Sequence, residues 1–153
     1  MNHLDHNNQL KPLFKVGQLD APLSPSLRGP LEVVSELLDR PIDGFNIVTT
    51  NGSTGVQTYG WKSPIKMHTD GTGYIFLMPL KIHGPFDYLV AGEHRLKLRV
   101  GGIYALNDLV EHCTMGTSKV IAAFQGSFDA ATILETPDFL ENIVQKFKEN
   151  CFS

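Results

Sequence analysis

The sequence predicts a mainly β protein, an antiparallel sandwich or barrel with a helix before it and a helix after it. Three observations predict this class. Short apolar or alternating segments follow one another between residues 45 and 128. Turn-forming steps such as Asn51-Gly52, Ala91-Gly92 and Gly101-Gly102 separate these segments. Helical spacing of apolar residues occurs only before and after this region, as expected for helices that flank a β core.

Length and composition limit the class of protein further. The chain has 153 residues, and we expect residues 1–153 to form a single domain. The formal net charge of -3 gives no field that would attract nucleic acid or an anionic membrane. No apolar run approaches the roughly 18 residues of a membrane span, and residues 1–19 lack the apolar centre of a signal peptide. We therefore expect a cytoplasmic protein, in which Cys113 and Cys151 are reduced thiols.

The N-terminal part is expected to hold loop and one helix. Residues 1–28 are rich in asparagine, serine and proline, and we expect them to be largely loop with one short strand at most. A helix is expected near residues 30–39, because proline suits its first position and leucine and valine recur at helical spacing. Pro41 and Gly44 are expected to end this helix.

The β core is expected to occupy residues 45–128. Its strand candidates are residues 45–49, 55–59, 65–70, 74–80, 86–90, 94–100, 103–106 and 119–124. The segment 74–80 is apolar almost throughout, which is typical of a buried strand.

The chain returns to helix near its C-terminus, over residues 136–149 within a tail of 136–152. Thr136 is a suitable N-cap, Pro137 suits the first helical position, and Asp138 favours the positive end of the helix dipole. An apolar stripe runs from Phe139 to Phe147 at helical spacing.

The segment His68-Thr69-Asp70 is the clearest candidate for a functional site. Residues two apart on a strand face the same side, so an imidazole and a carboxylate would converge there. His112 is the best candidate for a third ligand, because it follows a later apolar strand that Gly101-Gly102 opens. Two histidines and one carboxylate form the facial triad that binds non-haem iron(II) and leaves coordination positions open.

With these residues in this order, the sequence resembles the 2-oxoglutarate/iron(II)-dependent oxygenase superfamily. The pattern is His68-x-Asp70, an apolar strand at 75–80, a glycine-led strand at 102–106 that leads to His112, and then Lys119. The resemblance covers the residues from Tyr59 to Phe128. It implies a double-stranded β-helix, which is a jelly-roll-like barrel, with iron(II) and 2-oxoglutarate as cofactors and dioxygen as a reactant.

The resemblance also implies a cosubstrate site beside the metal. A basic residue after the second histidine would bind the distal carboxylate of 2-oxoglutarate. The family often has arginine there, whereas this chain has Lys119, which offers a point charge rather than a fork of donors. A second donor is then needed, and the hydroxyl groups of Thr72, Tyr74 and Ser118 are the candidates. The implied reaction is hydroxylation of a small-molecule or protein substrate, coupled to decarboxylation of 2-oxoglutarate.

An iron site of this kind needs a lining that keeps water away from it. The aromatic candidates for this lining are Tyr59, Trp61, Tyr74, Phe76 and Phe124.

Two other functions stay open from the sequence alone. The first is a cupin-like metal enzyme, which would use the same barrel and the same ligands without 2-oxoglutarate. The second is a non-catalytic β-sandwich with a binding or structural role. In that case His68 and Asp70 would lie on an exposed loop beside Gly71-Thr72-Gly73, without a metal ion.

Overall fold

The computed structural model describes residues 3–41, 47–51 and 56–152, with residues 47–51 described by their backbone alone. The strands are β1 (Leu13–Gln18), β2 (Ile47–Asn51), β3 (Gln57–Lys62), β4 (Tyr74–His83), β5 (Asp87–Ala91), β6 (His94–Lys97), β7 (Gly102–Asn107), β8 (His112–Gly116) and β9 (Lys119–Phe128). The helices are α1 (Arg28–Leu38), α2 (Ala130–Glu135) and α3 (Phe139–Cys151).

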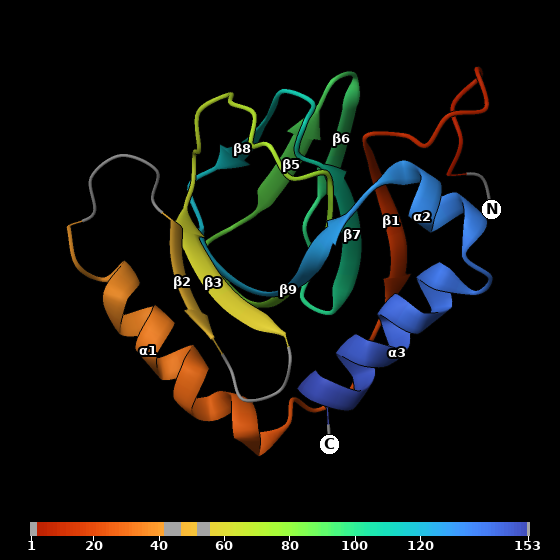
Figure 1. Cartoon of the computed structure of the whole chain (residues 1–153). Coiled ribbons are helices and arrows are strands. Elements are labelled where there is room, and N and C mark those ends of the chain that lie inside the picture. Colours follow the sequence, from red (N-terminus) through yellow and green to blue (C-terminus); the bar gives the residue numbers. More distant parts are fainter. Residues whose placement is uncertain (1–2, 42–46, 52–55, 153) are drawn as a thin grey trace.

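These elements form two antiparallel sheets with helices on one side (Figure 1). The larger sheet has the strand order β1-β7-β4-β9-β3-β2, and the smaller sheet has the order β6-β5-β8. The two sheets face each other, and the larger one curves around the space between them. The mainly β, jelly-roll-like class expected from the sequence is therefore confirmed. No helix in the described parts of the chain is long and apolar enough to cross a membrane.

The larger sheet is buried on both faces. Its inner face packs against the smaller sheet through an inner core that includes Trp61, Leu77, Leu89, Tyr104 and Val120. Its outer face packs against α2 and α3 through a second core that includes Phe14, Phe76, Ile103, Ile133 and Phe147. Burial on both faces explains why the sequence of β4 is apolar at consecutive positions rather than at alternating ones.

Helix α1 covers the outer face of the larger sheet at β3. Val34 and Leu38 of this helix are fully buried there. Gly60 of β3 allows the close approach, because a Cβ atom at this position would lie 2.6 Å from Val34 Cγ1 and 2.7 Å from Leu38 Cδ1. The helix begins two residues before the expected Pro30, since a 3₁₀ turn at Pro25–Leu27 leads directly into it.

The short strand that we expected in the first 28 residues is β1, which pairs with β7 at one edge of the larger sheet. The strand expected at 45–49 overlaps β2. Residues 45–46, and Gly44, which we expected to end the preceding helix, lie outside the described residues.

The strand expected at residues 65–70 is not formed. Only His68 pairs there, in a single bridge with His112 at the start of β8. The backbone N–H groups of this segment instead donate to three separate acceptors. The Ile65 amide donates to the Thr114 hydroxyl, the His68 amide to the His112 carbonyl and the Asp70 amide to the Asp108 carbonyl. The segment therefore runs beside the β7–β8 turn and the first residues of β8, where the Thr114 amide donates to the Ile65 carbonyl, without forming a regular ladder.

The expected helix at 136–149 is α3, which begins three residues later, at Phe139, and a separate short helix, α2, precedes it. Asp129 caps α2 by accepting a hydrogen bond from the Thr132 amide, and Thr136, which we expected to cap the C-terminal helix, ends α2 instead. Thr136 is extended because it precedes Pro137, which disfavours the helical conformation in the residue before it. Asp138 then has a φ of 57° before α3 begins at Phe139.

Asp87, at the start of β5, is a buried carboxylate whose burial is only partly compensated. Its side chain is fully buried, and neither carboxylate oxygen has a hydrogen bond to the described residues that meets ordinary distance and angle limits. Burial raises the pKa of Asp87 to about 6, and the nearby Ser63 hydroxyl and the Tyr88 and Ser118 amides offset only part of this shift. The folded protein therefore holds this proton to a higher pH than the unfolded chain does, and ionisation of Asp87 destabilises the fold.

We expect Asp87→Asn to raise the free energy of unfolding by about 2–3 kcal/mol at about pH 8 and to change it little at about pH 3.5. Below the usual carboxyl pKa both states carry the proton, so the parent and the variant differ there only by a neutral substitution. Urea denaturation at both pH values measures the difference. An equal gain at the two pH values would show that ionisation of Asp87 is not its source.

Candidate metal centre

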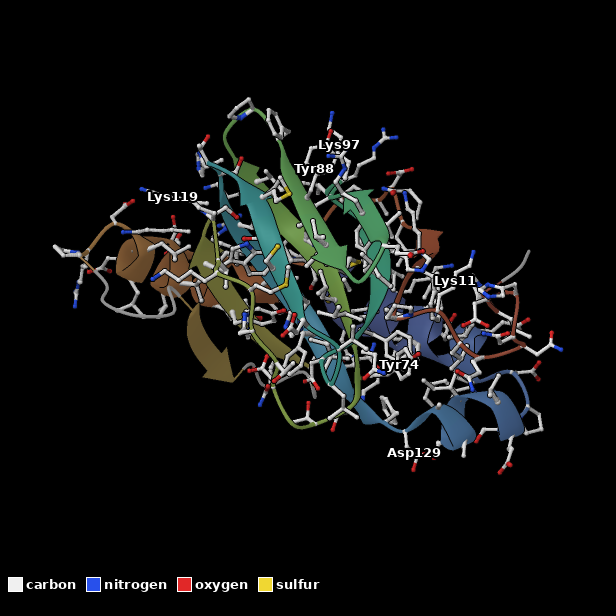
Figure 2. The ribbon with its side chains drawn as sticks, turned by 90° about the horizontal axis from the view of Figure 1, so that it is seen from above. Lys11, Tyr74, Tyr88, Lys97, Lys119 and Asp129 are labelled. Carbon is white, nitrogen blue, oxygen red and sulfur yellow. The ribbon has the colours of Figure 1, made fainter. Side chains whose placement is uncertain are left out.

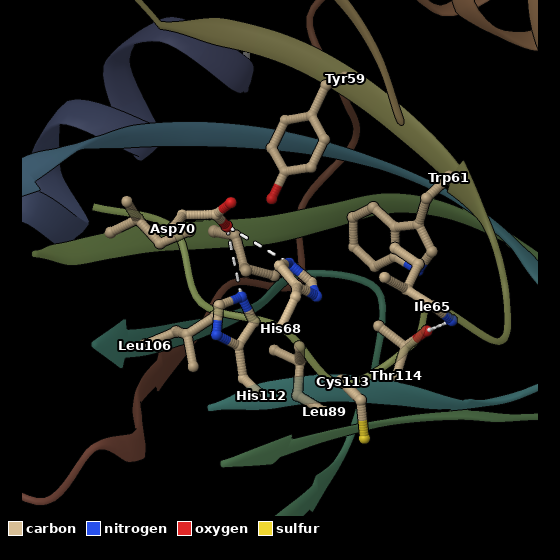
Figure 3. A pocket seen from close by; sticks show the side chains of 12 residues that line it. Tyr59, Trp61, Ile65, His68, Asp70, Leu89, Leu106, His112, Cys113 and Thr114 are labelled. Carbon is tan, nitrogen blue, oxygen red and sulfur yellow. Dashed lines mark hydrogen bonds and ion pairs between the residues drawn. The ribbon is translucent and has the colours of Figure 1, made fainter. Parts of the chain in front are cut away.

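Two histidines and an aspartate meet between the two sheets (Figure 3). His68 and His112 face each other across their single bridge, in which each amide donates to the other residue's carbonyl, at 3.0 and 2.9 Å. The bridge brings the two imidazole ring centroids to 4.3 Å from each other. Asp70 follows His68 by two residues, and its carboxylate lies over both rings.

The distances among the three side chains fit a single metal ion. Nε2 of His68 and Nε2 of His112 each lie 3.4 Å from Oδ2 of Asp70. One ligand atom from each residue lies within 4.8 Å of the other two. Neighbouring ligands that each lie about 2.1 Å from an ion are roughly 3.0–3.4 Å apart. The donor set of two imidazoles and one carboxylate is also the one that suits iron(II).

Backbone carbonyls fix the orientation of both imidazole rings. Nδ1 of His68 lies 2.6 Å from the Lys66 carbonyl oxygen, and Nδ1 of His112 lies 2.8 Å from the Val110 carbonyl oxygen. A carbonyl only accepts, so each Nδ1 carries a hydrogen and donates it. In a neutral ring with a hydrogen on Nδ1, the Nε2 lone pair is available to a metal ion. Both lone pairs then point toward the Asp70 carboxylate.

Asp108 holds the turn that carries Asp70. Its buried carboxylate accepts hydrogen bonds from the Thr72 amide at 3.0 Å, from the Gly73 amide at 2.7 Å and from the Thr72 hydroxyl. Its backbone carbonyl accepts from the Asp70 amide at 2.8 Å. Gly73 has a φ of 117°, and a Cβ atom there would lie 2.9 Å from the Phe128 carbonyl oxygen, so the turn requires glycine. From the sequence, Asp108 is one of three candidates, with Asn107 and Glu111, for an acceptor beside His112; the structure shows that its carboxylate instead holds the turn after Asp70.

Two cavities adjoin the three ligands. The inner cavity, of about 70 Å³, has a mainly apolar wall made of Tyr59, Trp61, Ile65, Ile75, Leu77, Leu89 and Leu106, with Cys113 and Thr114. The outer cavity, of about 430 Å³, is lined by Gln57, Tyr59, Asp70, Thr72, Ile75, Asp108, Phe124, Gly126 and Ser127. Asp70, Tyr59 and Ile75 belong to both walls, so the outer cavity meets the inner one at the carboxylate ligand.

Tyr59 places a hydroxyl group at the junction of the two cavities. Figure 3 shows this hydroxyl directed toward the Asp70 carboxylate. Its ring is held between Trp61, at a centroid distance of 5.4 Å, and Phe124, at 5.2 Å with edge-to-face geometry. Burial and the negative charge of Asp70 raise the pKa of Tyr59 well above its usual value. The phenol therefore stays protonated at neutral pH and can act as a hydrogen-bond donor.

The aromatic residues expected around the site divide into two groups. Tyr59 and Trp61 line the inner cavity, and Phe124 lines the outer one. Tyr74 and Phe76 do not line either cavity, because they lie in the core between the larger sheet and the helices.

Two hydroxyl groups expected to bind the cosubstrate lie elsewhere. The Tyr74 hydroxyl donates to the carbonyls of Leu10 and Lys11, and the Ser118 hydroxyl donates to the Phe86 carbonyl. Neither residue lines a cavity beside the candidate ligands. Thr72 does line the outer cavity, but its hydroxyl donates to Asp108.

Lys119 also lies away from the expected position. Its Nζ pairs with Asp39 Oδ1 at 2.9 Å at the end of α1, and its side chain is 42% exposed (Figure 2). Val120 and Ala122 of the same strand face the inner core, so the alternation of β9 turns Lys119 outward. The expectation that Lys119 lies inside the barrel, where it would bind a cosubstrate carboxylate, is wrong.

No lysine or arginine replaces Lys119 at the site. All 13 lysine and arginine residues of the chain are among the described residues, and none of them lines either cavity. The polar groups that face the outer cavity are therefore neutral or acidic.

The sequence matches no protein-family model and no curated protein. Solved structures with a similar fold include a cupin-2 domain containing protein from Shewanella frigidimarina, 12% identical with a TM-score of 0.42 over 59% of this chain and 87% of that one. A cupin domain from Bordetella pertussis is 15% identical, with a TM-score of 0.39 over 58% and 99% of the two chains. Salicylate 1,2-dioxygenase from Pseudoaminobacter salicylatoxidans is 14% identical, with a TM-score of 0.47 over 81% and 38%. At these identities, the similarity between this chain and the three proteins is one of fold alone.

We expect Asp108→Asn to weaken binding of Co²⁺ by about 10- to 100-fold while the fold is kept. An amide presents an N–H₂ group where the turn requires an acceptor, so the turn that carries Asp70 loses its anchor. Thr72→Val should weaken binding less, because it removes one of the three donors, and Thr72→Ser should match the parent. Calorimetric titration of each purified variant measures the affinity. Parent-like affinity of Asp108→Asn would show that Asp70 is positioned without this carboxylate.

Proposed function

We propose that the protein is a metal-dependent oxygenase, in which His68, Asp70 and His112 bind iron(II) beside sites for dioxygen and a small organic substrate. The observation that carries the proposal is the convergence of two Nε2 atoms and one carboxylate oxygen. Backbone carbonyls hold both rings in the orientation a metal requires. Such a triad leaves coordination positions open for reactants, which a purely structural metal site does not.

Iron(II) in this site would supply the one-electron chemistry that reaction with dioxygen requires. The surrounding residues would limit the size of the bound reactant, shield the imidazole ligands from water and donate a hydrogen bond. The inner cavity, at about 70 Å³, is about half the roughly 150 Å³ that holds a benzene ring, so it suits a diatomic molecule rather than an aromatic one. Its apolar wall shields the two buried imidazole rings from water, whereas the side chain of Asp70 is 54% exposed. The Tyr59 hydroxyl can donate a hydrogen bond at the boundary between the two cavities.

The absence of a nearby cation favours an oxygenase that does not use 2-oxoglutarate. A molecule of 2-oxoglutarate that bound the metal through its oxo acid end would still carry a second carboxylate. Neither cavity has a lysine or arginine in its wall to neutralise that group. Burial of an unpaired carboxylate is unfavourable. The order of His68, Asp70 and His112 along the chain still favours the 2-oxoglutarate-dependent reaction, which is therefore the second candidate.

We expect the purified protein to bind one iron(II) or cobalt(II) ion per chain, and Asp70→Ala to lose tight binding while its near-ultraviolet circular dichroism is unchanged. Removal of the carboxylate leaves two neutral ligands without the charge that holds the ion. Lys119→Met is the matched control, because it removes a charged group outside the site, and it should bind metal like the parent. Parent-like binding by Asp70→Ala would exclude Asp70 as a ligand, and no binding by the parent would favour a non-catalytic protein.

The two candidate reactions differ in one product. We expect no succinate when the iron-loaded protein is incubated aerobically with 2-oxoglutarate, since the second carboxylate has no cation to bind it. Chromatography of the reaction mixture measures succinate directly. Succinate that forms with the parent and not with Asp70→Ala would establish the 2-oxoglutarate-dependent reaction in place of the proposed one.

A further inference from the structure

We infer that the outer cavity binds a small, single-ring aromatic molecule whose far end carries no negative charge. The inference rests on the proposed metal centre, because the near end of the molecule is expected to face the ion at Asp70. Three properties of the cavity wall carry it: its aromatic surface, its lack of cations and its two carboxylates.

The size and the surface of the outer cavity suit one ring. Its volume of about 430 Å³ lies toward the lower end of the roughly 300–1,000 Å³ that ligand pockets occupy. Phe124, Tyr59 and Ile75 form its apolar wall. Phe124 and Tyr59 meet edge to face at 5.2 Å, an arrangement against which a further ring can pack. The smaller inner cavity leaves no comparable space for a ring.

The charges of the wall determine which substituents that ring can carry. The two ionised side chains in the wall, Asp70 and Asp108, are both acidic. Asp108 already accepts three hydrogen bonds, and Asp70 faces the histidines. The neutral polar side chains Gln57, Thr72 and Ser127, together with the Tyr59 hydroxyl, make up the rest of the polar wall. A carboxylate at the far end of a ligand would thus meet like charges and no cation, which disfavours it.

A bound metal ion does not remove this discrimination. Its charge acts most strongly on the group that contacts it, and the attraction falls with distance to the far end of the ligand. A ligand with its ionised group at the metal is therefore accepted, whereas one with a second anionic group at the opposite end is rejected. This rule separates molecules that have the same metal-binding end.

Two probes with the same metal-binding end test the inference. 4-Methylcatechol and 3,4-dihydroxybenzoate share one ring and two adjacent hydroxyl groups, and they differ in a methyl group against a carboxylate. With the cobalt(II)-loaded protein, kept free of oxygen, each probe that binds should change the visible absorption of the ion. We expect 3,4-dihydroxybenzoate to bind at least about tenfold more weakly than 4-methylcatechol, because like charges disfavour it.

A cation placed in the cavity wall should largely remove the preference. Gln57→Lys adds an ammonium group at the start of β3, where the side chain is exposed and borders the cavity. It should tighten binding of 3,4-dihydroxybenzoate by about tenfold and leave 4-methylcatechol within about twofold. Gln145→Lys is the matched control, since the same substitution at an exposed position of α3 changes the net charge equally but borders neither cavity. It should not change the ratio of the two affinities.

The possible outcomes distinguish a failure of the cavity inference from a failure of the metal centre. Equal affinity of the parent for both probes, or an equal effect of Gln57→Lys and Gln145→Lys, overturns the inference about the cavity and leaves the metal centre in place. A protein that takes up no cobalt overturns the metal centre, and the inference with it. A preference for 4-methylcatechol that Gln57→Lys removes, and that Gln145→Lys leaves unchanged, establishes the charge selection.

Discussion

The site depends on one short antiparallel bridge, the pair of backbone hydrogen bonds between His68 and His112. The segment that carries His68 and Asp70 belongs to neither sheet, and this bridge, with the hydrogen bonds between Ile65 and Thr114, attaches it to the smaller sheet at β8. Because the two residues are directly opposed, their rings leave the backbone side by side. Each ring then turns its Nδ1 to the carbonyl two residues before it, and the two Nε2 atoms are left facing Asp70.

The larger sheet connects the site to the rest of the fold through β3. Gly60 turns toward α1 and lets Val34 and Leu38 approach the sheet, whereas Tyr59 and Trp61 on either side of it turn toward the cavities. The same strand thus contacts a helix on one face and lines the two cavities on the other. The outer face packs against the helices, and the inner face packs against the smaller sheet around the small apolar cavity.

Sequence patterns predicted the features that depend on neighbouring residues. They failed for features that depend on which distant strands pair with each other. The apolar run of β4 and the order of His68, Asp70 and His112 could be recognised because composition and spacing alone carry them. The face of the sheet on which the Lys119 side chain lies could not be recognised in this way. It is fixed by the register of β9, in which Lys119 pairs with Lys62 of β3 and with His83 of β4. His112 likewise begins a new strand in the other sheet, after a turn that the sequence does not separate from β7. The role of Asp108 could not be predicted either, because its partner Thr72 lies 36 positions away along the chain.

The acceptors that orient the two imidazole rings have a consequence for how such a protein can diverge. They are main-chain oxygens of Lys66 and Val110, and no amino-acid substitution deletes a main-chain oxygen. The side chains that give the outer cavity its shape and charge, such as Gln57, Phe124 and Ser127, contribute nothing to these two hydrogen bonds. Substitutions at those positions can therefore change the shape and charge of the outer cavity, while the main-chain acceptors that orient His68 and His112 stay in place.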